Sequence, residues 1–276
     1  MKPAIVMQTD FTLGSSVSTM FGVCRIIDPE VSVFNGTHNI RQFDVLGASH
    51  SLMYICPFWP DDTIFVSVVD PGVGTARRAC VAKLSSGQYI VTPDNGALTY
   101  PFERIGITEI REIDDKHRFP TTRDVSIFHG RDLFAYVAAK LASGVITYEQ
   151  VGPEYPVEEI ILVPYARPVV KDGVISGMLT HSSAHFGLVD TNIPYKWMEE
   201  NGILHGDIVN VKLLHHGKPV FDRDVLHHKS FGYVPEGEPV LVCSETQHML
   251  IALNRRNIVT EYDLKDGPDY TMEIRK

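Results

Sequence analysis

Short apolar runs, each ending at a polar residue and a turn, dominate the chain up to about Pro164. The clearest are AIVMQTD (residues 4–10), VSVFNGTH (31–38), TIFVSVVD (63–70) and QYIVTPDNG (88–96). Runs of this kind are typical of strands buried on both faces of a parallel sheet. Residues 17–28 and 43–54 between them have helical periodicity. The pattern predicts an α/β fold with a mainly parallel sheet flanked by helices.

The pattern changes near Arg167. Beyond it the strand-like pieces are short and turns such as LHHGKP and VPEGEP are frequent, and only residues 195–201 have a helical pattern. This pattern of short strands and frequent turns favours a smaller, mostly antiparallel β domain. We therefore expect an α/β domain over residues 1–166 and a β domain over residues 167–276.

Acidic and amide side chains follow three of the predicted strands. Asp10, Asp70, Asp94 and Asn95 all stand where a strand ends. Ligands of parallel α/β sheets bind at the carboxyl ends of the strands. A single aspartate in such a place is about as often a turn cap as a ligand, so the agreement of several strand ends carries the expectation of a site.

Two segments add candidate chemistry to this edge. VVDPGVGTARR leaves a strand through a glycine turn and presents Arg77 seven residues after Asp70, and FHGRDLFAYVAAKLASG places His129 before an amphipathic helix. A histidine beside a helix start is, by itself, more often structural than catalytic. Spacing alone therefore says only that an aspartate, an arginine and a histidine can meet at one rim of the sheet.

Composition narrows the class of partner. The net charge of −9 and the pI near 5.7 argue against binding to a nucleic-acid backbone. The four cysteines form no CxxC pair, which favours a reducing, cytoplasmic setting. No stretch approaches the roughly 20 apolar residues of a membrane span. Adjacent histidines on a strand point to opposite faces, so the pairs 215–216 and 227–228 are expected to be mostly exposed and without a metal ion.

The motifs resemble those of a known family. VVDPGVGTARR, VTPDNGALT and FHGRDLFAYVAAKLASG are similar to the signature blocks of the S-adenosyl-L-methionine (SAM) hydroxide adenosyltransferases, relatives of the fluorinating and chlorinating enzymes. MQTDF and THNIRQFDVLGA continue the similarity, in family order, over nearly all of residues 4–152. The resemblance implies hydrolysis of SAM to adenosine and L-methionine, with SAM as substrate and no cofactor or metal. It also implies a homotrimer whose active sites lie between subunits.

The resemblance also implies roles for individual residues. The family's water-binding set falls on Asp70, Arg77 and His129. Asp10 matches the acid that binds the ribose hydroxyls, and Phe43 matches an aromatic residue beside the sugar. Two further substrate-binding positions are expected in this half of the chain, at Asn95 and Gly130.

Water is the nucleophile that the resemblance implies. The halide-using relatives carry aromatic residues at the positions of Asp70 and His129, and the fluorinating enzyme has a serine at the position of Gly130. This chain keeps the aspartate, the histidine and the glycine.

The similarity is weaker in the second half. Phe186 and Phe231 retain the two aromatic positions that flank adenine. In contrast, Ser183 replaces the acid that binds the methionine ammonium, Leu188 replaces an adenine-reading asparagine, and Arg255 replaces a small residue. These departures leave two alternatives open: the substrate is a different 5′-activated adenosine, or SAM is held by other groups.

Two alternative functions follow from the same residues. A protein that binds adenosine or SAM without turnover is favoured by the C-terminal departures and disfavoured by the intact set of Asp70, Arg77 and His129. A metal-dependent hydrolase is the second alternative, because the potential ligands of a divalent ion at one rim are Asp10, Asp70, Asp94 and His129.

Overall fold

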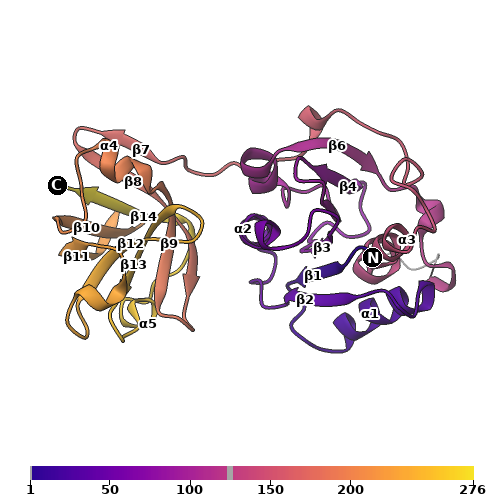
Figure 1. The fold of residues 1–276 in the computed structure, drawn as a ribbon, viewed down its shortest axis with the longest axis horizontal. Helices are drawn as coiled ribbons and strands as arrows, with labels where there is room; N and C mark the ends of the chain where they lie inside the picture. The colour runs from indigo at the N-terminus through magenta and orange to yellow at the C-terminus, as the bar shows by residue number, and fades with distance from the viewer. Residues whose placement is uncertain (1, 123–126) are drawn as a thin grey trace. The chain divides into compact units, whose positions relative to one another are not determined.

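The computed structural model describes residues 2–122 and 127–276, which form two compact units, Met1–Val163 and Pro164–Lys276. The first is an α/β unit and the second a β barrel (Figure 1). The expected α/β class is confirmed.

The first unit is built on a six-stranded sheet in the order β2-β1-β3-β5-β4-β6. Neighbouring strands are parallel from β2 to β5, whereas β4 pairs antiparallel with both β5 and β6. The prediction of a mainly parallel sheet is therefore only partly correct. The cause is the tight turn between β4 and β5, where the N–H of Gly87 donates to the carbonyl of Leu84, since so short a connection joins only antiparallel strands. The strands are β1 (Ile5–Thr9), β2 (Val33–Thr37), β3 (Ile64–Val68), β4 (Ala79–Leu84), β5 (Tyr89–Pro93) and β6 (Ile107–Glu112).

Helices cover both faces of this sheet, as the alternating pattern predicted. On one face, Met20 and Phe134 pack with strand residues such as Met7 and Val66. On the other, Leu52 of α2 packs with Phe65 and other strand residues. The helices are α1 (Ser15–Ile27), α2 (Val45–Ile55), η1 (Cys56–Phe58), η2 (Pro101–Ile105), η3 (Asp115–His117), η4 (Pro120–Thr122), η5 (Gly130–Ala135), α3 (Tyr136–Ala142) and η6 (Val157–Glu159).

The second unit is an eight-stranded, mostly antiparallel sheet in which β14 also pairs with β8. This pairing closes the sheet into a barrel, which the sequence pattern did not predict. Val189, Ile251 and Met272 belong to the core that fills it. The elements are β7 (Val169–Lys171), β8 (Val174–Ser183), β9 (Leu188–Pro194), α4 (Lys196–Glu200), β10 (Ile208–His215), β11 (Lys218–His227), η7 (Phe231–Tyr233), β12 (Pro239–Cys243), β13 (His248–Leu253), α5 (Ile258–Glu261) and β14 (Gly267–Arg275).

Candidate active site

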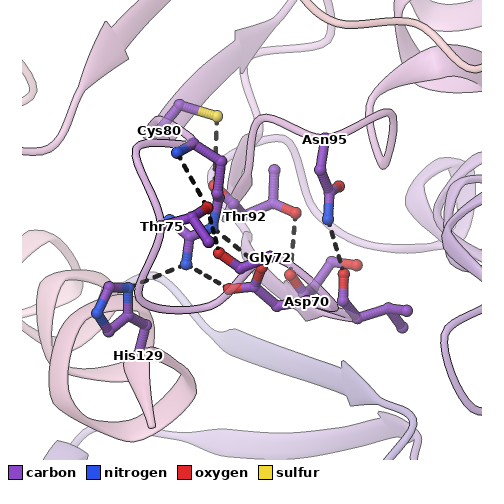
Figure 2. A network of polar contacts seen from close by, with 10 residues as sticks. Asp70, Gly72, Thr75, Cys80, Thr92, Asn95 and His129 are labelled. Atoms are coloured by element: carbon purple, nitrogen blue, oxygen red, sulfur yellow. Dashed lines mark hydrogen bonds and ion pairs between the residues drawn. The ribbon is translucent and has the colours of Figure 1, made fainter. Parts of the chain in front are cut away.

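A buried polar network joins three of the expected site residues. Asp70 follows β3, and the turn after it returns the chain so that Arg77 precedes β4. The Arg77 guanidinium donates from Nε to Asp70 Oδ1 over 3.0 Å and from Nη2 to Asp70 Oδ2. Nη2 also lies 2.9 Å from His129 Nδ1, so that Asp70 and His129 are joined through one guanidinium (Figure 2). The side chains of Asp70 and Arg77 are only 5% and 9% exposed.

This geometry fixes the proton on His129. A guanidinium only donates hydrogen bonds, so Nδ1 must accept and a neutral ring carries its proton on Nε2. Burial, followed by the positive charges of Arg77 and Arg118, lowers the pKa of His129 and favours that neutral form. Nε2 is itself buried and has no hydrogen-bond partner among the described residues.

Gly130 allows the close packing around this network. A Cβ on Gly130 would lie 3.2 Å from Phe128 Cε2 and 3.3 Å from Val68 Cγ1, closer than side chains normally pack. Gly130 therefore begins helix η5 in a space that has little room for a side chain.

A second carboxylate opens onto the same pocket as Asp70. Asp10 follows β1, and its Oδ2 accepts a hydrogen bond of 2.9 Å from the backbone N–H of Phe43. Phe43 has a positive φ of 66° and is 60% exposed. The pocket has a volume of about 290 Å³ and is lined by Asp10, Phe11, Ser16, Gln42, Phe43 and Asp70.

The carboxyl edge of the sheet, where ligands of α/β proteins bind, is thus where Asp10 and Asp70 come together. A larger pocket of about 370 Å³ lies at the opposite edge, beside the amino ends of β3 and β5, and contains none of the expected site residues. We assign the candidate site to the pocket that holds the two carboxylates.

Asn95 and Asp94 both make internal contacts. Asn95 donates from Nδ2 to the carbonyl of Val69 over 3.0 Å, and its Oδ1 accepts from the backbone of the same turn. Asp94 is buried and accepts hydrogen bonds from the Tyr155 hydroxyl and the Ile161 N–H. Burial raises the pKa of Asp94. Asp94 is therefore held inside the unit and does not line the pocket with Asp10 and Asp70.

The expected site residues of the second unit lie on its surface. Phe186 occupies the turn between β8 and β9 and is 75% exposed, and Phe231 begins η7 and is 38% exposed. Ser183 accepts a hydrogen bond from the N–H of Phe186. Leu188 is partly buried, and Arg255 occupies an exposed turn with a positive φ of 55°.

Sequence reasoning did not single out the contacts that support the pocket. His38 is buried after β2, and its Nδ1 lies 2.9 Å from Thr9 Oγ1 at the end of β1. Thr9 Oγ1 also accepts from the N–H of Phe11, which lines the pocket. The sequence signal that could have identified this contact was the pair of polar residues, Thr9 and His38, at the ends of two neighbouring strands. For Ser16 and Gln42, which also line the pocket, the pattern held no signal.

The histidine pairs differ from expectation in two respects. His227 is buried instead of exposed, and its Nδ1 hydrogen-bonds to the carbonyl of Leu241. The rings of His215 and His216 lie 4.4 Å apart, because His216 leaves the strand with a positive φ of 48°.

Across residues 2–122 and 127–276, no three His, Cys, Asp or Glu side chains group as metal ligands. None of the helices in these ranges has the length and apolar character of a membrane crossing.

Fold and site together define a small-molecule-binding α/β protein with an appended β barrel. Family models for the SAM hydroxide adenosyltransferase N-terminal and C-terminal domains match residues 5–152 and 184–271. The chain belongs to the SAM hydroxide adenosyltransferase family.

Individual relatives extend over most of the chain. An (R)-S-adenosyl-L-methionine hydrolase of Thermus thermophilus is 33% identical over 87% of both chains, and a fluorinase of Actinoplanes is 26% identical over 98% of this chain and 97% of the relative. The crystal structure of an uncharacterized conserved protein from Thermotoga maritima has a TM-score of 0.89 and 34% identity, and it covers 99% of this chain and 100% of its own.

Proposed function

We propose that the protein hydrolyses SAM, by attack of water at C5′ of the ribose, to adenosine and L-methionine. The observation that carries the proposal is the pocket onto which Asp10 and Asp70 both open, with Asp70 fixed by Arg77. Relatives that are 33% and 36% identical are named (R)-S-adenosyl-L-methionine hydrolase. The reaction as written needs only SAM and water.

The chemistry requires a positioned nucleophile more than a strong one. Sulfonium is a good leaving group, so the C5′–S bond breaks with its electron pair going to sulfur as the C5′–O bond forms. Asp70 is the group in the pocket that takes the proton of the attacking water. Arg77 holds the carboxylate in place and stabilises negative charge on the oxygen that loses its proton.

His129 acts mainly through Arg77 in this proposal. Its Nδ1 accepts from the guanidinium, so that Arg77 is held from two sides, by Asp70 and by His129. A neutral ring also avoids adding a second positive charge to the buried network. Its Nε2–H, buried and without a partner among the described residues, is a donor available to a water molecule.

The substrate contacts of the first unit follow from the same pocket. Oδ2 of Asp10 accepts from Phe43, which leaves Oδ1 to accept from the vicinal ribose hydroxyls. Phe43 presents an exposed ring to the sugar. Gly130 keeps the space around the network narrow, and Asn95 acts by holding the turn after β5.

We further propose that the β unit completes the nucleoside pocket, with Phe186 and Phe231 against adenine, and that the protein is a homotrimer with shared sites. A pocket of about 290 Å³ is at the lower end of the range for small-molecule sites, which supports a second contributing surface. Light scattering that reports a monomer at micromolar concentration contradicts the trimer.

The four unpaired cysteines support a reducing compartment such as the cytoplasm.

The test is direct. Purified protein incubated with SAM should release adenosine and L-methionine in equal amounts, measured by liquid chromatography. SAM that binds in calorimetry but yields no adenosine over a long incubation would favour the non-catalytic binding protein. Loss of activity with EDTA and recovery with a divalent ion would favour the metal-dependent hydrolase.

A further inference from the structure

The strand register of the barrel places Asp190 on the outer face of the sheet. Val189 on β9 points into the barrel core, so its neighbour Asp190 points out. Asp190 pairs with His181 on β8 and with Leu250 on β13, and side chains of paired residues share a face. Ser183 and Leu188 form the next outward pair, immediately before the turn that carries Phe186.

This outer face is apolar around Asp190. Val240, Val242, Leu250 and Ala252 form a buried cluster there, against which Leu188 and Val234 pack. The segment that contains Val234 is fastened to the barrel by Asn254, whose Nδ2 donates to the Val234 carbonyl over 2.7 Å. This segment begins with the half-exposed ring of Phe231.

The Asp190 carboxylate forms no ion pair within the part of the chain that the structure describes. No hydrogen bond or ion pair reaches it from any residue in 2–122 or 127–276. Burial, together with the negative charge of Glu245 in the turn after β12, raises its pKa to about 6, against a lowering influence from His181. A cation that binds a partly buried carboxylate offsets part of the cost of its desolvation.

We propose that Asp190 binds the ammonium group of the methionine half of SAM, on the outer face of the barrel beside Phe186. This assignment rests on the proposed hydrolysis of SAM. It explains how the chain tolerates Ser183, which hydrogen-bonds to the Phe186 N–H and carries no charge. At about 3.3 Å per strand residue, Asp190 lies roughly 7 Å along β9 from Leu188, within the reach of one extended ligand.

The test compares two sulfonium substrates in the intact protein. SAM carries the ammonium group, whereas 5′-deoxy-5′-(dimethylsulfonio)adenosine keeps the reacting C5′–S bond and lacks it. Asp190→Asn should raise the KM for SAM by about ten- to hundredfold, the effect of losing one charged hydrogen bond. The KM for the truncated sulfonium should stay within about threefold. Asp222→Asn, on the exposed surface of the same barrel, should change neither.

The pH dependence gives a second readout. As pH falls from 7.5 to 5.5, Asp190 takes up a proton and loses its charge, so the KM of the wild type for SAM should rise. In Asp190→Asn it should stay flat over this range. His181 and Glu245 are present in both proteins, so the difference between the two profiles reports Asp190.

Equal losses for the two substrates, or an unchanged KM for SAM, would overturn the assignment. If the wild type turns over neither sulfonium, the proposed hydrolysis fails. In that case, calorimetry of both compounds with the wild type and with Asp190→Asn tests the Asp190 assignment separately. The substitution should weaken the binding of SAM and leave the binding of the truncated sulfonium unchanged.

Discussion

Asp70→Asn is the substitution that separates the proposed chemistry from the structure that supports it. The side chain keeps its shape, and its Oδ1 still accepts from Arg77 Nε. The amide nitrogen, however, faces the Nη2 donor and leaves the guanidinium, which is 9% exposed, without its counter-ion. Loss of one charged hydrogen bond predicts a decrease of about 2 kcal/mol in the free energy of unfolding.

The effect on turnover should be larger than the effect on stability. Without the Asp70 carboxylate, the attacking water loses the proton acceptor assigned to it, and turnover should fall about a hundredfold or more. Urea unfolding measures the stability, and chromatography of adenosine measures the turnover of SAM.

Asp94→Asn is the matched control, because Asp94 also ends a strand and is buried by hydrogen bonds to Tyr155 and Ile161. It should lose stability while keeping turnover within a few fold of the wild type. Turnover by Asp70→Asn within threefold of the wild type, or an equal loss in Asp94→Asn, would refute the assignment of Asp70 as proton acceptor.

Three further substitutions test other parts of the structure. Gly130→Ala should lower the free energy of unfolding by about 1–3 kcal/mol, because its Cβ meets Phe128 and Val68, and an unchanged melting temperature contradicts this. Phe186→Ala should leave stability within about 0.5 kcal/mol but raise the KM for SAM, since its ring is exposed, and an unchanged KM removes it from the substrate site. Burial lowers the pKa of His227, so below pH 6.5 the unfolded chain binds a proton that the folded chain does not. Between pH 7.5 and 5.5 the free energy of unfolding should therefore fall more for the wild type than for His227→Asn. Equal decreases of the two proteins in urea unfolding would refute this.

The local pattern of apolar and polar residues was sufficient to predict most helices and strands of the first unit. The helix predicted over residues 17–28 is Ser15–Ile27, and the one predicted over residues 43–54 is Val45–Ile55. The latter begins later because Phe43 adopts a positive φ, which hydrophobic periodicity does not encode. The closure of the barrel through β14 and β8 depends on pairing between residues 88 to 101 positions apart in the sequence, which local pattern does not report.

The site was predictable to different degrees. Asp70 and Arg77 are joined by one turn, so their proximity was visible in the spacing. His129 reaches Arg77 only because helix η5 packs against α1 and the sheet, and the motif resemblance was needed to associate them. Asp190 was not found, because its significance depends on which face of the barrel each strand residue occupies.

The central claim is that water attacks C5′ and displaces the thioether, and the isotope content of the product tests it most directly. Hydrolysis of SAM in oxygen-18 water, followed by mass spectrometry of the adenosine, should show one oxygen-18 atom in the 5′-hydroxyl for each turnover, with none in methionine. Adenosine without the label, or no adenosine from either sulfonium substrate, would contradict the claim.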